Sequence, residues 1–597
     1  MKRLALAPAL CLALCLCLPA TGVFAQAVPT ATPQATAADR AFQAIYQAEW
    51  AWRMQQASGG EEDGDPNATT HNTHLPDVGP QAQAAKLAYL QGVLKQLDGV
   101  DVQALSPAEQ VNYAIYRPQI EHAAASLRFR DYEMPFNSDS AFWSNLDFMA
   151  RADLREAAAY HAYAARLRDV PRYFDQQIAN MRAGLARGFS VPRAVLAGRD
   201  GAIAMTAELQ DPEAASLWAP YKTLPGTIPA AEQEALRTEG RAAIRDAVIP
   251  AFARLLAFYR NEYMPKARTT LAAEAMPDGK AWYREQIRTY TTLDLSPDDI
   301  HAIGLREVAS IRAEMDAIID GLGFEGTSKE NRFSDFLHFL RTDPQFYART
   351  PQELLNDAAW ISKQVDGQVG RIIGTLPRGR FTIVPVPASI APFWTAGRGG
   401  AGTYWVNTYD LPSRPLYNLP ALTLHESSPG HALQQSLVLE QGALPGFRKD
   451  YISAYGEGWG LYSEWLGKEM GIYRTPYEDF GRLTYAMWRA CRLVIDTGIH
   501  HQGWSRAQAI AYLKDNTALS EHEVETEVDR YISWPAQALS YKLGELTIMR
   551  LRREAETTLG TRFDERGFHD AILSQGALPL PVLEAQVRAW MAAQQAK

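Results

Sequence analysis

Apolar residues recur at helical spacing along most of this 597-residue chain. Between residues 81 and 187 an Ala- and Leu-rich pattern predicts about four antiparallel helices, with breaks near Ser106, Asp139 and residues 169–171. From residue 420 to the C-terminus the pattern is again helical, with short turns. The sequence therefore predicts a protein that is mainly α.

Proline positions refine these helices. Residues 230–266 predict one long helix or a kinked pair with its break at Pro250, because proline removes a backbone donor and clashes with the preceding turn. Ser296 and Thr350 each stand directly before a proline, the arrangement of an N-cap residue followed by proline at the first helical position. Helices are predicted to begin at these two sites and to run to residue 321 and to about residue 376.

Strand patterns are confined to two short segments, residues 380–386 (RFTIVPV) and 402–408 (GTYWVNT). The glycine-rich residues 397–402 between them are interpreted as a turn. We expect a small antiparallel β-sheet here, immediately before the segment that carries the candidate chemistry.

The N-terminus has the pattern of a secretory signal. Lys2 and Arg3 precede an apolar run over residues 4–18, and small residues follow at a cleavage site after Ala25. A transmembrane anchor is disfavoured because the run is short, and a lipoprotein signal because Cys15 and Cys17 follow leucines. We expect a signal peptide over residues 1–25, a flexible tether over 26–38, and a periplasmic or secreted mature chain.

The charge and the cysteine content argue against a nucleic-acid-binding protein and against a fold stabilised by disulfide bonds. The formal net charge of −9, with no Lys/Arg-dense run, gives no electrostatic footprint for nucleic acid. Three of the four cysteines lie in the signal peptide, so the mature chain keeps Cys491 alone and has no internal disulfide. Its stability must come from a large buried core.

The candidate chemistry begins with LTLHESSPGH, residues 422–431. Two histidines on one helix face with a glutamate after the first are typical of zinc hydrolases, and the usual spacing is four residues. Here His425 and His431 are six apart, so a regular helix would turn the second ring roughly 240° from the first. Pro429 and Gly430 could form a bulge that brings both rings together. Alternatively, they simply end a helix and the histidines are unrelated.

A second segment, YGEGWGLYSEWLGKEM (residues 455–470), predicts a helix that carries Glu457 and Glu464. Glycines flank Glu457 on both sides, although each glycine weakens a helix by about 1 kcal/mol. Such a helix fits a place where another backbone or a metal approaches closely. Glu457 is a candidate third ligand, and Glu464 could orient a ligand histidine or simply lie on a solvated face.

HESSPGH followed by GEGWGLYSEWLG resembles the bacterial "domain of unknown function 885" family of predicted zinc peptidases. Supporting segments are residues 403–415, 496–500, 503–504 and 530–544. The resemblance implies a large bilobal helical fold, distantly similar to carboxypeptidase Taq, thimet oligopeptidase and angiotensin-converting enzyme, with lobes over roughly 39–290 and 291–597. Two positions depart from the family pattern: Ala432 stands where a further histidine is common, and Pro535-Ala536 where Pro-Gly is usual.

The resemblance also implies roles. His425, His431 and Glu457 would bind one Zn²⁺, and Glu426 would act as general base and then as general acid. The developing oxyanion needs a further donor. Tyr541 is the first candidate and His500 the second, with a core tyrosine and a buried structural histidine as the alternatives.

Substrate contacts are expected from two places. The strand at 402–408, with Tyr404, Val406 and Asn407, would pair with an extended peptide. Arg492 and Lys542 could hold a substrate C-terminal carboxylate, or serve in structural ion pairs. The predicted function is cleavage of peptide bonds in short peptides. Two alternatives remain: hydrolysis of non-peptide or cell-wall amides by the same zinc chemistry, and non-catalytic binding of peptides or metal on the same scaffold.

Overall fold

The computed structural model describes residues 35–56, 71–138, 140–388, 391–441 and 444–596. The predicted signal peptide, most of the predicted tether, and Asp139 lie outside these residues. Helices account for 71% of the chain and strands for 3%, which confirms the mainly α class. Within the described residues, no helix is both long enough and apolar enough to cross a membrane.

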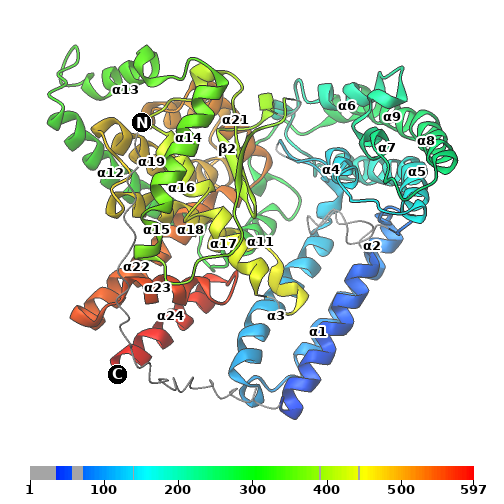
Figure 1. Cartoon of the computed structure of the whole chain (residues 1–597), viewed down its shortest axis with the longest axis horizontal. Helices are drawn as coiled ribbons and strands as arrows, with labels where there is room; N and C mark the ends of the chain where they lie inside the picture. Colours follow the sequence, from blue (N-terminus) through cyan, green and yellow to red (C-terminus); the bar gives the residue numbers. More distant parts are fainter. Residues whose placement is uncertain (1–34, 57–70, 139, 389–390, 442–443, 597) are drawn as a thin grey trace, which may run out of the picture.

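The chain forms two groups of helices (Figure 1). The smaller group gathers α4–α9 at one end of the molecule, and the long helices α1–α3 run beneath it. The larger group contains α11–α24 and the sheet. The N-terminal bounds are α1 Ala37–Gln56, α2 Pro80–Leu97, α3 Pro107–Phe129, α4 Phe142–Met149, α5 Ala157–Arg187, α6 Asp200–Ala207, α7 Ala219–Lys222, α8 Ala230–Ala243, α9 Ile249–Phe258 and α10 Met264–Lys266.

Two prolines in this region act differently. The predicted break at residues 169–171 is wrong, because α5 continues through Pro171. Val170 and Phe174, both fully buried, anchor the helix on either side of this proline and compensate for the lost backbone hydrogen bond. At Pro250 the predicted irregularity is present: a π turn over Ile244–Val248 joins α8 to α9 just before the proline.

The larger group begins with α11. Its helices are α11 Gly279–Thr291, α12 Pro297–Gly321, α13 Arg332–Thr342, α14 Pro351–Asp366, α15 Val369–Ile372, α16 Leu419–Glu426, α17 His431–Glu440, α18 Ser453–Glu469, α19 Pro476–His500, α20 Arg506–Asn516, α21 Glu521–Ser533, α22 Ser540–Leu559, α23 Glu565–Leu573 and α24 Leu580–Gln595. Ser296 caps α12 in a capping box with Asp299, and Thr350 caps α14. Both predicted starts are confirmed, but α14 ends ten residues before the predicted position, at Asp366.

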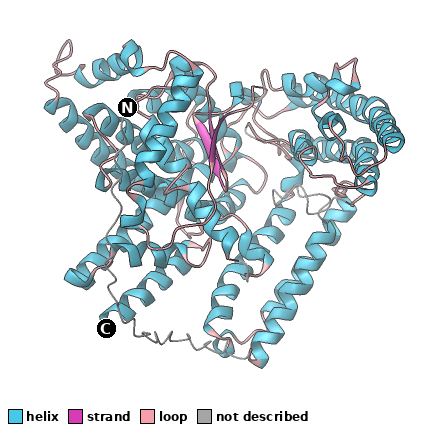
Figure 2. Ribbon diagram, viewed as in Figure 1, coloured by secondary structure: helices cyan, strands magenta, loops and turns pink. Residues whose placement is uncertain are grey.

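The sheet has three strands in the order β1-β3-β2: β1 Thr382–Pro385, β2 Gly397–Gly400 and β3 Thr403–Val406. It is mixed rather than antiparallel, because β1 runs parallel to β3 and only β2 is antiparallel. The glycine-rich segment predicted as a turn is thus largely an edge strand. The sheet lies at the flank of the larger group that faces α4–α9 (Figure 2).

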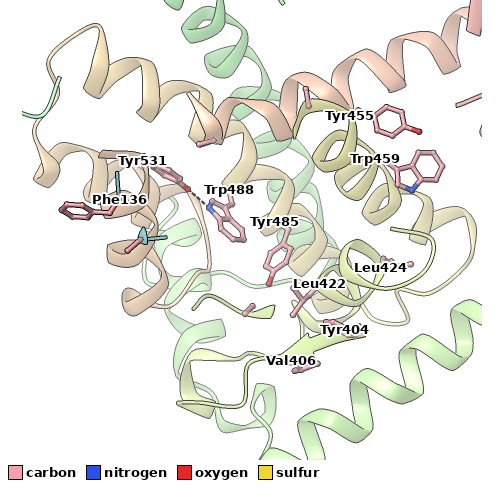
Figure 3. Close-up of a cluster of buried hydrophobic side chains, with 14 of the residues drawn as sticks. Phe136, Tyr404, Val406, Leu422, Leu424, Tyr455, Trp459, Tyr485, Trp488 and Tyr531 are labelled. Atoms are coloured by element: carbon pink, nitrogen blue, oxygen red, sulfur yellow. Dashed lines mark hydrogen bonds between the residues drawn. The ribbon is translucent and has the colours of Figure 1, made fainter. Parts of the chain in front are cut away.

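A buried cluster fixes the sheet to the helices that carry the candidate site. Figure 3 shows Tyr404 and Val406 of β3 beside Leu422 and Leu424 of α16. Trp459 of α18 and the aromatic residues Tyr485 and Trp488 of α19 extend the same cluster. β3, α16, α18 and α19 therefore share one buried core, against which the candidate site is packed.

Candidate metal centre

The two histidines lie at the junction of two helices. α16 ends at Glu426 and α17 begins at His431, and the Ser428–Pro429 peptide between them is cis. Across the break, the Gly430 N–H donates to the carbonyl of Leu424 at 3.1 Å. The indole of Trp459 donates to the Pro429 carbonyl at 2.8 Å, so α18 holds the junction in place.

Gly430 is required by this path. A Cβ atom at this position would lie 1.9 Å from the carbonyl oxygen of His425, well inside contact distance. The predicted break at Pro429-Gly430 is present, as an interruption between two helices rather than as a bulge within one. It has the predicted effect, because it returns the second histidine to the side of the first.

The imidazoles of His425 and His431 face one carboxylate. Their ring centroids are 4.7 Å apart with nearly perpendicular planes. The Nε2 atom of each ring lies 3.3 Å from the same oxygen, Oε2 of Glu457 on α18. The three candidate ligand atoms lie within 4.8 Å of one another, and no other group of three such side chains occurs in the described part of the chain. Two imidazoles and a carboxylate are a donor set suited to zinc with an open coordination position.

The glycines of α18 permit this approach. A Cβ at Gly460 would lie 2.7 Å from Cε1 of His425, so α18 can pack directly against the imidazole. Gly458 lies against Gly544 of α22 in the same way. The sequence-based interpretation of these glycines, as places of close approach, is confirmed.

Glu464 forms a hydrogen bond with the ring nitrogen of His425 that does not face Glu457. Its Oε1 lies 2.8 Å from Nδ1 of His425, and Arg489 contacts the same oxygen at 3.3 Å. Both ring nitrogens of His425 thus face a carboxylate, Nδ1 that of Glu464 and Nε2 that of Glu457. With a metal on Nε2, Glu464 would accept the hydrogen bond from the Nδ1 proton. Glu464 is 1% exposed, which excludes the solvated-face alternative.

The carboxylates around the two histidines stabilise positive charge in this pocket. Burial by itself would lower the pKa of His425, but hydrogen bonds to Glu457 and Glu464 raise it from 6.5 to about 10. Burial would raise the pKa of Glu457, whereas the two histidines lower it well below its usual range. The site therefore concentrates negative potential in a buried space, as a divalent cation requires.

Glu426 lies beside this cluster, at the edge of the sheet. Its Oε2 accepts a hydrogen bond from the backbone N–H of Gly399 at 2.5 Å. A Cβ at Gly399 would lie 1.9 Å from the carbonyl oxygen of Glu426, so the strand must carry glycine here. Sequence reasoning missed Gly399; the signal was the run of glycines at 397–402, which was interpreted only as a turn.

Two tyrosines flank the cluster. The ring of Tyr541 lies 6.3 Å from that of His425 and nearly parallel to it, and its hydroxyl accepts a hydrogen bond from Arg530. Tyr451 was not singled out from the sequence. Its ring lies 6.5 Å from that of His431 and packs against Gly456, and it is 52% exposed. The signal available was an aromatic residue six positions before Glu457.

The structure contradicts the prediction of His500 as the second candidate oxyanion donor. It is fully buried, and both ring nitrogens are engaged by backbone groups: Nδ1 accepts from the Ala273 N–H at 3.1 Å, and Nε2 lies 2.8 Å from the Tyr531 carbonyl. Burial lowers the pKa of His500 to about 3, so the ring stays neutral. His500 is therefore a buried structural histidine, which was the alternative to its role as oxyanion donor.

The predicted substrate strand is also corrected. β3 is the central strand, with β1 on one side and β2 on the other, so it has no open edge for a peptide. Tyr404 and Val406 are buried in the core, and the Asn407 amide donates to the carbonyls of residues 391, 394 and 395. Within the described residues, the outer edge of β2 pairs with no further strand, and its Gly399 N–H donates to the Glu426 side chain.

Arg492 and Lys542 serve structural ion pairs. Arg492 is 1% exposed and donates to Glu527 at 2.7 Å. Lys542 is buried between Glu545 at 2.8 Å and Glu307 at 3.2 Å. Neither presents its charge to a substrate, because each is enclosed with its own carboxylate partners.

The sequence profile of the family described as "Bacterial protein of unknown function (DUF885)" matches residues 58–587. None of the curated proteins matches the chain. Among solved structures, a candidate lipoprotein from Colwellia psychrerythraea is 25% identical with a TM-score of 0.84, over 94% of this chain and all of that one. A candidate lipoprotein of unknown function from Shewanella oneidensis is 16% identical with a TM-score of 0.67, over 92% of this chain and 98% of that one, and shares the fold.

Proposed function

Because the chain belongs to the DUF885 family of bacterial proteins of unknown function, we propose a function from its own residues: a zinc-dependent hydrolase that cleaves peptide bonds in short peptides. The observation that carries the proposal is the convergence of His425, His431 and Glu457 beside Glu426. A protein that only bound metal would have no need of a further carboxylate at this place.

His425, His431 and Glu457 would hold the zinc ion, with Glu464 fixing the tautomer and orientation of His425. When bound, zinc would polarise the scissile carbonyl and increase the acidity of water. The remaining steps fall to side chains of this chain.

Glu426 is the proposed proton carrier. The Gly399 N–H holds one of its oxygens, which leaves the other to remove a proton from the attacking water. The water oxygen then adds to the carbonyl carbon, and Glu426 gives the proton to the leaving nitrogen as the C–N bond breaks. Tyr541, whose ring lies 6.3 Å from that of His425, would donate a hydrogen bond to the developing oxyanion.

The open edge of β2 supports a peptide substrate. The Asn407 N–H donates to the carbonyl of Ala396, and in an antiparallel ladder hydrogen-bonded pairs alternate with pairs that are not bonded. Gly397 and Gly399 therefore point their backbone groups away from β3, as the Gly399–Glu426 contact illustrates. An extended peptide added to this edge would pass directly in front of Glu426.

Export is part of the proposal. The signal pattern over residues 1–25 supports a periplasmic or secreted location. The two similar structures come from proteins described as candidate lipoproteins, which agrees with export. Short peptides outside the cytoplasm would then be the available substrates.

The test compares the mature chain with Glu426→Gln. Zinc is measured by elemental analysis, and cleavage with a mixed library of short peptides. We expect about one zinc per chain in both proteins, and a loss of cleavage of 10³-fold or more in the variant. Zinc binding by the wild type without any peptide cleavage would contradict the proposal and favour amide hydrolysis of another kind or simple binding.

A further inference from the structure

A small cavity of about 30 Å³ lies at the start of β2. Its walls come from three places: the approach to β2, helix α21, and the segment between α3 and α4. The lining residues are Ser138, Trp394, Thr395, Gly397, Arg398, Thr526, Glu527 and Arg530. The cavity is thus formed where the larger group of helices meets the N-terminal part of the chain.

Two arginines line this cavity, and an indole orients each of them. The guanidinium of Arg398 lies 4.3 Å from the ring of Trp394, and that of Arg530 lies 5.5 Å from the ring of Trp534. Arg530 already contacts Glu527, Gln537 and the Tyr541 hydroxyl. A guanidinium has five N–H donors, so a carboxylate in the cavity would be added to these contacts. Paired arginines are the usual means of recognising a carboxylate.

The negative charge of Glu527 repels an anion in the cavity only weakly. It is fully buried and contacts Arg492 at 2.7 Å and Arg530 at 3.4 Å. Burial would raise its pKa, but the two arginines lower it to about 2. Among the charged residues that line the cavity, Arg398 and Arg530 outnumber Glu527, and Arg492 pairs with Glu527 as well, so the local charge is positive.

Side-chain contacts and strand β2 link the lining of the cavity to the candidate metal centre. Arg530 donates to the hydroxyl of Tyr541, and the Tyr541 ring lies 6.3 Å from that of His425. Along the strand, Gly397 at the cavity is two residues from Gly399 at Glu426, roughly 7 Å of extended chain. The cavity therefore lies one or two peptide residues beyond the point where Glu426 would act.

Strand direction selects the end of the peptide that reaches the cavity. A peptide added antiparallel to β2 has its C-terminal end at the N-terminal end of β2, which is where the cavity lies. A parallel peptide would instead bring its positively charged amino end to the two arginines. The charges favour the antiparallel arrangement.

We propose that this cavity binds the C-terminal carboxylate of a short peptide, so that the protein removes a fragment of one or two residues from the C-terminal end. This inference rests on the proposed peptidase function and specifies its substrate. Arg398 and Arg530 are the binding residues, in place of Arg492 and Lys542.

The experiment uses two probes, N-acetyl tetra-alanine with a free carboxylate and the same peptide as a C-terminal amide. We expect the zinc-loaded wild type to cleave the free acid with a kcat/KM about 10- to 100-fold above that of the amide. Arg398→Gln should lower the value for the acid about tenfold and leave that for the amide unchanged, with Arg398→Lys between them. Arg155→Gln removes an exposed arginine outside the cavity as the matched control.

The outcomes separate the two proposals. Equal cleavage of acid and amide by the wild type would overturn the carboxylate site and leave the peptidase standing. The same holds if Arg398→Gln keeps the wild-type preference, or if activity depends on a free amino end instead. Failure to cleave any peptide with zinc bound would overturn the peptidase. Preferential binding of the acid by Glu426→Gln would still support the carboxylate site, and equal binding would contradict it.

Discussion

The Nδ1 atom of His425 lies 2.8 Å from Oε1 of Glu464, and both side chains are buried. In a metal-bound site this contact would hold the proton on Nδ1 and leave Nε2 for the metal. Glu464→Gln replaces a carboxylate by an amide that can present either a donor or an acceptor. We expect zinc affinity to fall about 10- to 100-fold, measured by competition with a chelator. Glu234→Gln, which removes an exposed carboxylate on α8, should leave the affinity unchanged; an equal loss in both variants would contradict the orienting role.

Gly460 lies against the ring of His425, and a Cβ there would be 2.8 Å from Nε2. Gly460→Ala should displace the ring and lower zinc affinity tenfold or more, although alanine is the better helix former. Gly201→Ala is the matched control, because Gly201 lies in α6 with nothing within 4 Å of an added Cβ. That variant should gain about 0.5–1 kcal/mol in the free energy of unfolding and keep its zinc affinity. Unchanged zinc binding in Gly460→Ala would show that the close packing does not position the ligand.

The hydroxyl of Tyr541 receives a hydrogen bond from Arg530 and keeps its own hydrogen to donate. Tyr541→Phe is expected to lower kcat about 10²-fold or more with little change in KM, as loss of an oxyanion donor does. Tyr451→Phe tests the half-exposed tyrosine beside His431, and a smaller effect on kcat is expected there. Tyr512→Phe on α20 serves as the control. If Tyr451→Phe has the larger effect on kcat, the donor is Tyr451 and the assignment of Tyr541 is wrong.

The burial of His500 predicts that the protein loses stability at acid pH. Its pKa is about 3 in the folded protein and near 6.5 when exposed, so the unfolded chain binds the proton more readily between these values. Stability from this residue is complete above pH 6.5 and is lost as pH falls toward 3, by up to about 5 kcal/mol. His500→Asn should be less stable at neutral pH by about 1–3 kcal/mol, because backbone groups lose their partner, and should lose less stability on acidification.

Denaturant unfolding of the zinc-free proteins between pH 3 and pH 7 measures this difference. His74→Asn, a substitution in an exposed loop, should follow the wild-type curve. Parallel curves for His500→Asn and the wild type would exclude His500 as a source of the acid dependence.

The sequence was sufficient for the parts of the site that lie close together in the chain or carry distinctive residues. The interruption at Pro429-Gly430 and the role of the α18 glycines follow from local backbone chemistry. Glu457 was expected from its distance along the chain after His431 and from the family resemblance. The helix starts at Ser296 and Thr350 were predictable for the same reason, since capping involves a few adjacent residues.

The errors concern groups whose partners are remote in sequence. His500 and Lys542 bear functional-looking side chains, but each has one partner more than 200 residues away, Ala273 for His500 and Glu307 for Lys542. Likewise, a strand pattern at residues 402–408 says nothing about which neighbours pair with it. Its glycine-rich neighbour β2 has almost no strand propensity, and it becomes a strand only through β3 and α16.

The composition of β2 also bears on solubility. An unpaired strand edge can pair with other chains and begin aggregation, a risk that rises with its length and apolar content. β2 is four residues long and consists of three glycines and Arg398, so it offers few side chains for another copy to pack against. A longer or more apolar β2 would add a site for self-association, so substitutions intended to strengthen this strand should lower the concentration at which the protein stays monomeric.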